Sequence, residues 1–398
     1  MSVRRAIAMF VVAVALLAGC RATEDDRPPE PVRPRWEMAD LPVPPGSPGR
    51  LIVRDVTACA GQWYAVGAVG AADGGTRPAA WRSADGRGWV PLPSRPISYY
   101  GERAILYAVG CHEGRIAVVG ARSGGAHGNP RVRTWRQDTD GGLTEVPAEF
   151  ELYGGPDAVS VSRIAGGAGG WLIAGARTGG AAVWRSPDAA GFALVDDAPG
   201  LTSDSRLTTI ATDALAVPDG WLVGGAGRPA DRADRDPFVW SSGDGRTWTR
   251  LALPATNADE IVQRLVRVGP VVHALGVRGS GFQAWAFVPG VGSPGTAPGA
   301  GEWRAVAGFG ATGTGAVAGV EAAAGGGGVL LAMTVAADGH RLWRSAADGA
   351  SWVPVALPVE VSAGGDTSAA VAAQGGRMVV TVDDGAAAKV WFAPSGHV

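Results

Sequence analysis

The sequence predicts an all-β fold in which copies of one small antiparallel sheet follow each other in a ring. Tryptophan recurs at intervals of 45 to 58 residues, and an apolar run after a turn precedes each recurrence. Each interval accommodates four short strands. The 398 residues include 62 glycines and 28 prolines, as many tight turns require, and no long helical pattern follows residue 20. The recurring residues are Trp81, Trp135, Trp184, Trp240, Trp285, Trp343 and Trp391.

One turn sequence occurs twice almost unchanged, as Trp81-Arg-Ser-Ala-Asp85-Gly-Arg-Gly-Trp89 and as Trp240-Ser-Ser-Gly-Asp244-Gly-Arg-Thr-Trp248. Glycine supplies the positive φ that a hairpin needs, and the aspartate can accept hydrogen bonds from the backbone of its own turn. The serine hydroxyl serves the same backbone, and the second tryptophan covers the hairpin. Looser copies of the turn occur around Asp188 and Asp348. We therefore expect structural roles for Ser83, Asp85, Trp89, Asp188, Ser242, Asp244, Trp248, Asp348 and Trp352.

This repeated turn resembles the Asp-box, Ser-x-Asp-x-Gly-x-x-Trp, which is found in sialidases and many other β-propellers. In that family the box lies on the hairpin between the third and fourth strands of a blade, away from the active site. The two good copies depart from it, because their glycine and tryptophan come one place early. Four copies in one chain indicate a propeller and carry almost no weight for catalysis. With seven tryptophan units, the prediction is a seven-bladed β-propeller of four-stranded antiparallel blades.

The last of these units ends before its outermost strand, because only seven residues follow Trp391. A matching segment lies near the other end of the chain, where Arg35-Trp36-Glu-Met-Ala-Asp-Leu-Pro42 resembles the stretches 248–254 and 352–358. We expect this N-terminal strand to pair with the last blade and close the ring, which removes an exposed sheet edge. The predicted propeller spans residues 35–398.

The N-terminus has the pattern of an export signal over residues 1–19. Arg4 and Arg5 precede an apolar run that is too short to favour a transmembrane helix. The stretch Leu17-Ala-Gly-Cys20 resembles a bacterial lipobox, which implies cleavage before Cys20 and two acyl chains on its sulfur. The alternative is an ordinary secretory signal with a chance cysteine. We expect a lipid-anchored protein on the extracytoplasmic face of the cell membrane, with residues 20–34 as a lipidated cysteine and proline-rich linker.

Charge and histidine placement exclude several kinds of partner. A formal net charge of −2 gives no basis for binding nucleic acid or a membrane through a basic surface. The five histidines are scattered and form neither a metal-ligand spacing nor a Ser/His/Asp set. We expect no metal, no cofactor and no catalytic residues of these kinds.

Two cysteines besides Cys20 occupy the same place in successive units. Cys59 and Cys111 each stand just before an apolar run, so adjacent hairpins can bring them together. An exported protein meets an oxidising compartment, and a disulfide across this spacing contributes about 4 kcal/mol in the chain-entropy model. The alternative is two buried free thiols. We predict the disulfide.

Ligands of propellers generally bind in the channel or on the face opposite the Asp-box hairpins, so the loops of that face are the place to look. The crossover 94–103 contains Tyr99, Tyr100, Glu102 and Arg103, and the next crossover contains Tyr153. Aromatic rings beside charged groups suit a sugar or a peptide. The alternative is that these are solvated loops whose aromatic side chains pack on neighbouring blades.

Five arginines lie in or near the innermost strands of successive blades, and several pointing into the channel would make an anion site. The alternative is that they form ion pairs with carboxylates such as Asp55, Glu102, Asp204 and Glu260. The five are Arg54, Arg103, Arg163, Arg206 and Arg264.

The main functional prediction is a membrane-anchored scaffold that binds a protein or glycan without chemistry. One alternative is a sialidase-like glycoside hydrolase, whose family uses a tyrosine nucleophile with a glutamate, an arginine triad and an aspartate acid/base. That family typically has six blades and an Arg-Ile-Pro motif, whereas this chain has only Arg95-Pro-Ile. A further alternative is an envelope assembly factor, because propellers of the photosystem II assembly and sortilin types share similar repeats. No motif specific to either type is present.

Overall fold

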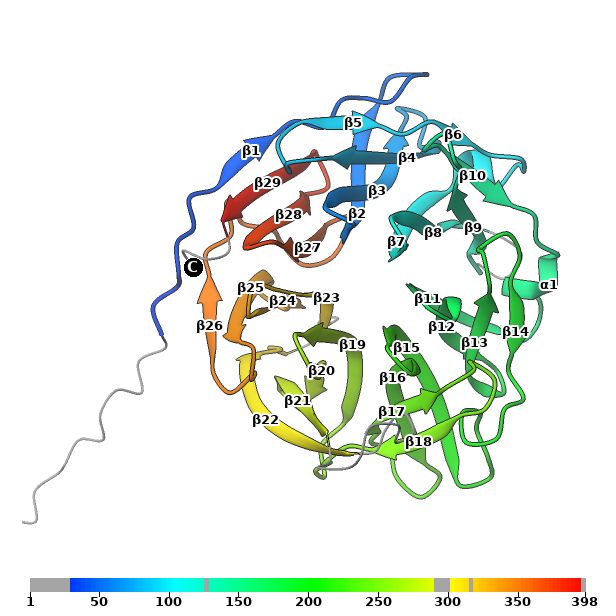
Figure 1. Ribbon diagram of the computed structural model, residues 1–398, viewed down its shortest axis with the longest axis vertical. Coiled ribbons are helices and arrows are strands. Elements are labelled where there is room, and N and C mark those ends of the chain that lie inside the picture. Colours follow the sequence, from blue (N-terminus) through cyan, green and yellow to red (C-terminus); the bar gives the residue numbers. More distant parts are fainter. Residues whose placement is uncertain (1–28, 125–128, 290–300, 315–317, 395–398) are drawn as a thin grey trace, which may run out of the picture. The chain divides into compact units, whose positions relative to one another are not determined.

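The computed structural model describes residues 29–124, 129–289, 301–314 and 318–394, and almost all of them belong to one compact unit that starts at Pro31. Seven antiparallel sheets surround a central axis (Figure 1). This confirms the predicted seven-bladed β-propeller. The helices in the described part are η1 (Gly101–Arg103) and α1 (Phe150–Tyr153), and no helix there is long and apolar enough to cross a membrane.

Each blade runs from an innermost to an outermost strand. Blade 1 is β2 (Arg50–Cys59), β3 (Gln62–Gly70), β4 (Thr76–Ser83) and β5 (Trp89–Pro91). Blade 2 is β7 (Ile105–His112), β8 (Arg115–Arg122), β9 (Arg131–Gln137) and β10 (Leu143–Val146), with β6 (Ser94–Arg95) added outside it. Blade 3 is β11 (Ala158–Gly167), β12 (Gly170–Arg177), β13 (Gly180–Ser186) and β14 (Ala193–Val195).

The remaining blades follow the same order. Blade 4 is β15 (Leu207–Val217), β16 (Gly220–Pro229), β17 (Asp236–Ser242) and β18 (Thr249–Ala252). Blade 5 is β19 (Glu260–Val268), β20 (Val271–Arg278), β21 (Gly281–Pro289) and β22 (Gly301–Ala311). Blade 6 is β23 (Gly319–Gly326), β24 (Val329–Ala336), β25 (Gly339–Ala346) and β26 (Trp352–Val355). Blade 7 is β27 (Ser368–Gln374), β28 (Arg377–Asp383), β29 (Ala388–Pro394) and β1 (Glu37–Ala39).

The recurring tryptophan lies in the third strand of every blade, and in four blades its indole ties that strand to the chain that enters the blade. The indole N–H of Trp81 donates to the backbone oxygen of Pro42 at 2.8 Å, and that of Trp240 donates to Gly200 at 2.7 Å. Trp184 and Trp285 make the same kind of bond. These four rings are completely buried between blades. In these four blades the residue that sets the sequence period therefore also holds the entering chain in place.

The Asp-box turns join the third and fourth strands. Oδ1 of Asp244 accepts the backbone N–H groups of Arg246 and Thr247, both at 2.8 Å, and the Ser242 hydroxyl accepts that of Gly245. Gly245 has a φ of 71°, which favours glycine. Asp85 and Ser83 bond their own turn in the same way, whereas Asp188 and Asp348 each accept one backbone N–H.

The ring closes on its outer side through the N-terminal strand. β1 pairs antiparallel with β29, with Met38 opposite Trp391, which is the predicted closure. The closing segment begins earlier than predicted, because Val32 forms a bridge to Val355 at the edge of blade 6 and the Trp36 indole donates to Ala356. One N-terminal segment thus crosses the edges of blades 6, 7 and 1.

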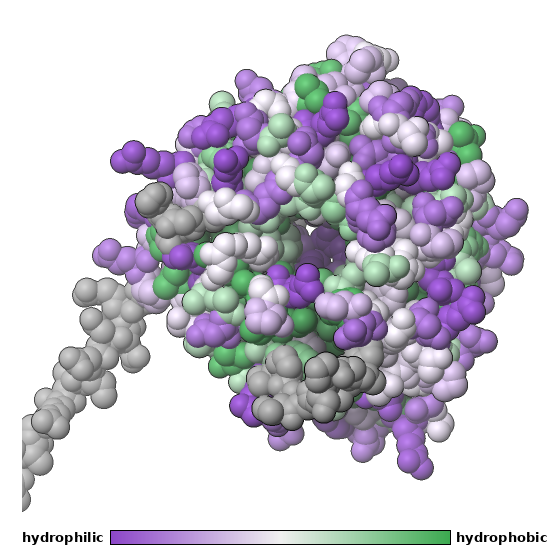
Figure 2. Space-filling view, in the orientation of Figure 1, coloured by the Kyte–Doolittle hydropathy of each residue, from purple (hydrophilic) through white to green (hydrophobic). Residues whose placement is uncertain are grey.

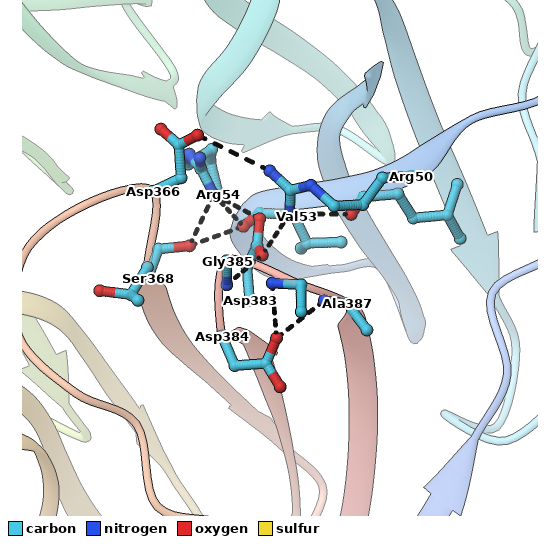
Figure 3. Close-up of polar contacts among 12 residues, drawn as sticks. Arg50, Val53, Arg54, Asp366, Ser368, Asp383, Asp384, Gly385 and Ala387 are labelled. Atoms are coloured by element: carbon cyan, nitrogen blue, oxygen red, sulfur yellow. Dashed lines mark hydrogen bonds and ion pairs between the residues drawn. The ribbon is translucent and has the colours of Figure 1, made fainter. Parts of the chain in front are cut away.

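The same junction is closed on its inner side by ion pairs (Figure 3). The Asp383 side chain at the end of β28 is completely buried and receives Arg50 and Arg54 of β2, each at 2.7 Å. Ser368 of β27 accepts from Arg54 and donates to the Val53 oxygen at 2.7 Å. The last blade is therefore held to the first near the channel as well as at the rim.

A disulfide joins Cys59 at the end of β2 to Cys111 near the end of β7, with their Cα atoms 5.5 Å apart. The predicted bond is thus present and links blades 1 and 2. The predicted signal peptide, Cys20 and most of the predicted linker lie outside the described residues.

Candidate functional site

The crossover from blade 1 to blade 2 is shaped by a buried carboxylate. Glu145 of β10 is 2% exposed and accepts the backbone N–H groups of Ile97 and Ser98 at 2.7 and 2.9 Å. Arg133 of β9 lies 3.2 Å from the same carboxylate. A Cβ at Gly101 would lie 1.9 Å from a Glu145 oxygen, so the loop can pass the carboxylate only with glycine there. This anchor holds the side chains of the crossover in place at the surface.

Tyr99 and Tyr100 extend from this crossover and form stacked contacts with arginines. Tyr99 is 63% exposed, carries the Arg103 guanidinium 3.9 Å above its ring, and meets Tyr100 edge to face at 5.3 Å. Arg103 also pairs with Glu102 at 3.0 Å. The four residues predicted on this loop therefore lie together at the surface.

The next crossover adds an aromatic ring that sequence reasoning did not single out. Phe150, the first residue of α1, is 49% exposed. Arg131 of β9 lies 4.5 Å from the Phe150 ring and 5.7 Å from the Tyr100 ring, so it connects the two crossovers. A four-residue helix has no periodicity to show which side chain is exposed. We define the blade-2 patch as Ile97, Tyr99, Tyr100, Arg103, Arg131 and Phe150.

Tyr153, the other predicted residue of this crossover, is buried rather than exposed at the rim. It is 4% exposed, packs on Trp184 at 5.8 Å and lies 3.3 Å from the Thr134 hydroxyl. Burial raises the pKa of Tyr153. The tyrosine therefore fills the space between blades 2 and 3, as the alternative interpretation of the loop expected.

Tyr153 is nevertheless part of the wall of a hollow between blades 2 and 3. Its volume is about 360 Å³, and apolar side chains such as Tyr107, Val132 and Val159 form much of its wall. Val159 is 56% exposed. The hollow shares β9 and α1 with the blade-2 patch through Val132 and Tyr153, and its wall also includes Arg54.

Charged side chains gather in the channel at one level of the inner strands. Register shifts occur there in six of the seven innermost strands, and in four of them a charged residue follows the shift. These four are Asp55, Arg163, Asp213 and Arg264. Figure 2 shows hydrophilic residues inside the central opening. A cavity of about 300 Å³ lies along the channel from this level.

Two of the predicted arginines converge there, but on protein acceptors. Arg163 of blade 3 pairs with Asp55 of blade 1 at 2.8 Å and donates to the backbone oxygen of Glu321 in blade 6 at 2.7 Å. Arg264 donates to the same oxygen through Nε at 2.8 Å. Burial and the neighbouring Arg163 charge lower the pKa of Arg264 to about 10. The inner groups thus hold non-adjacent blades together.

The two carboxylates at this level bond the next blade. Asp55 accepts the backbone N–H of Val109 at 3.0 Å, and Asp213 accepts that of Leu265 at 2.8 Å. Burial raises the pKa of Asp213. Hydrogen bonds from one blade to the backbone of its neighbour therefore repeat around the ring.

The other three predicted arginines lie elsewhere. Arg54 belongs to the closure with Asp383, Arg103 belongs to the blade-2 patch, and Arg206 is exposed on the crossover before β15. Of the five arginines, Arg163 and Arg264 meet in the channel, and the pairs Arg163–Asp55 and Arg103–Glu102 are two that the ion-pair alternative expected. Among the described residues, no group of three His, Cys, Asp or Glu side chains is placed to hold a metal ion.

Comparisons with known proteins agree on the architecture. No protein-family model and no curated protein matches the sequence. Among solved structures, the chain is similar to the Cps50 (Swd1) β-propeller domain of Myceliophteria thermophila, with 12% identity over 89% of this chain and 99% of that chain and a TM-score of 0.53. The fold is shared; a family is not shown.

Two further similar structures are those of enzymes. A puromycin-hydrolyzing peptidase of Mycobacterium tuberculosis is 15% identical, with a TM-score of 0.52 over 87% of this chain and 51% of that chain. A Trypanosoma rangeli sialidase is 12% identical, with a TM-score of 0.43 over 93% of this chain and 59% of that chain. This chain therefore spans between half and three fifths of the length of those two enzymes.

Proposed function

We propose that the protein is a lipid-anchored, extracytoplasmic propeller that binds a protein or glycan through the blade-2 patch and catalyses no reaction. The supporting observation is where large apolar side chains are exposed. Seven such side chains are exposed in the described part of the chain; Ile97, Tyr99 and Phe150 belong to the blade-2 patch, and Val159 lies in the wall of the hollow between blades 2 and 3. A concentration of exposed apolar groups beside arginines is typical of a binding surface.

The arrangement of the channel arginines favours a binding protein over a sialidase-like enzyme. A sialidase-like reaction would need three arginines that face a substrate carboxylate, with a tyrosine and a glutamate nearby. Arg163 and Arg264 instead donate to the Glu321 backbone oxygen, and Arg163 is neutralised by Asp55. The phenol of Tyr107 donates to the Val161 backbone oxygen at 2.6 Å, and burial raises its pKa, which disfavours the phenolate.

Photo-crosslinking in the native host tests the binding function. A photoreactive amino acid at position 99 is expected to give a discrete adduct, whereas one at Val90, which is 48% exposed on β5, gives none. Equal adducts at both positions would show that the patch is not a binding surface. Turnover of a fluorogenic sialoside by the purified protein would show that the enzyme alternative is right.

The membrane anchor has its own test. Cys20→Ser is expected to move the protein from the membrane fraction to the soluble extracytoplasmic fraction, because the acyl chains provide the lasting anchor. Metabolic labelling with an alkyne fatty acid is expected to mark the natural protein and not the variant. Labelling of both would place the acyl chains elsewhere.

A further inference from the structure

We infer that the ligand of the blade-2 patch is a protein segment that carries a carboxylate beside a large apolar side chain. This inference rests on the proposed binding function and narrows it. The carboxylate binds Arg131, and the apolar side chain enters the hollow between blades 2 and 3.

The hollow between blades 2 and 3 can hold the apolar side chain of the ligand. The hollow of about 360 Å³ has room for one aromatic or branched aliphatic side chain, and its wall includes Ile105, Tyr107, Val132, Tyr153 and Val161. Val159 is exposed in the same wall. Filling the hollow removes the apolar surface from water, which is how a buried anchor residue contributes most of the affinity of an interface.

We infer a carboxylate in the ligand from the partners that Arg131 lacks. Its neighbours have carboxylate partners, since Arg103 pairs with Glu102 at 3.0 Å and Arg133 lies 3.2 Å from Glu145. No carboxylate of the described residues lies within 4.0 Å of Arg131, and its buried Nε has no hydrogen-bond acceptor there. The Phe150 and Tyr100 rings hold the guanidinium in place. A carboxylate can therefore bind a preoriented guanidinium.

The surroundings favour a protein over a glycan or a lipid surface. Ile97 and Val159 offer no group that could bind a sugar hydroxyl, and arginines already lie against the Tyr99 and Phe150 rings. Exposed carboxylates at Glu102, Glu149 and Glu151 border the patch. These carboxylates would repel the dense negative charge of an anionic membrane. They also restrict where a ligand can place a carboxylate, and Arg131 is the position that accepts one.

A peptide selection tests this inference. The full-length protein, held in lipid nanodiscs, is panned against a random dodecapeptide phage library. Enriched peptides are expected to carry Asp or Glu within three residues of a large apolar side chain. A synthetic peptide of the enriched sequence should bind Arg131→Ala and Phe150→Ser at least tenfold more weakly than the wild type. Arg304→Ala, which removes an exposed arginine on β22, should bind it unchanged.

Thermal melting first checks that Arg131→Ala and Phe150→Ser are folded. Enriched peptides without a carboxylate, or equal binding to Arg131→Ala, would overturn the inference. A glycan array that gives patch-dependent binding while the peptides fail would also overturn it, yet leave the proposed function standing. Patch-dependent binding to phosphatidylglycerol vesicles would assign the surface to the membrane. Absence of any patch-dependent binding would overturn both proposals.

Discussion

The channel and the blade-2 patch both contain arginines, but the two regions use them differently. In the channel, Arg163 donates to Asp55 and to the Glu321 backbone oxygen of blade 6, and Arg264 donates to the same backbone oxygen. In the patch, Arg131 lies against two aromatic rings and has no carboxylate within 4.0 Å among the described residues. An arginine whose partners belong to the protein stabilises the fold, whereas one without such partners remains available to a ligand.

Substitutions in the two regions should also differ in whether they change stability or binding. Removing one member of a buried ion pair leaves a charge without compensation, so interior changes carry large costs. Changes at exposed residues away from such features usually change stability by no more than about 0.5 kcal/mol. The two regions should therefore respond in opposite ways to unfolding and binding measurements.

The largest effect on stability is expected at the channel. Asp55→Ala leaves Arg163 unpaired and removes the acceptor of two backbone N–H groups. We expect the free energy of unfolding to fall by about 3–5 kcal/mol, measured by urea denaturation. Glu302→Ala breaks an exposed ion pair with Arg304 and serves as the control. Equal losses for both variants would show that the channel pair does not stabilise the ring.

The second largest effect on stability is expected at the disulfide. It links the innermost strands of blades 1 and 2 and lies away from the crossover loops that carry the patch. Replacing Cys59 and Cys111 by serine is expected to cost about 2–4 kcal/mol of stability and to leave peptide binding at the patch unchanged. Differential scanning calorimetry measures the first effect, and the wild type with dithiothreitol should approach the variant. A variant that melts with the wild type would mean that the bond adds no stability.

The fold could be predicted from the sequence because its signals are local and repeated. Trp81 and its six counterparts mark the third strand of every blade, and Asp85 and Asp244 mark the turns that follow. The resemblance of 35–42 to the ends of other blades predicted the closing strand, which the β1 pairing confirms.

The candidate site was only partly predictable, because its parts are far apart in sequence. Tyr99, Tyr100 and Arg103 were found by composition, but Arg131 is an ordinary strand residue until the fold places it between two crossovers. The channel was harder still. The register shifts that precede Arg163 and Asp55 depend on strand pairing, which no spacing rule gives, and Arg206 lies outside β15 on the crossover.

A smaller effect is expected at the Asp-box. Asp244→Ala removes the acceptor of two backbone N–H groups and should cost about 1–2 kcal/mol of stability, with exposed Asp219→Ala as the control. Hydrogen bonds from Thr247 and Arg246 hold the pKa of Asp244 below its usual range. Its contribution is therefore fully present above about pH 5 and is lost as the pH falls through the lowered pKa. Asp244→Asn should show a flatter decline in acid, and an unchanged slope would contradict this role.

The smallest change in stability, and the largest in binding, is expected at the patch. Tyr99→Ala combined with Phe150→Ala removes two half-exposed rings that leave no buried group unsatisfied. The free energy of unfolding should stay within about 0.5 kcal/mol of the wild type, whereas crosslinking and peptide binding at the patch should be lost. Chemical denaturation and binding are measured on the same preparation. A loss of several kcal/mol would show that the rings are part of the packed fold, and the contrast between patch and channel would disappear. Retained binding in a stable variant would place the ligand elsewhere on the ring.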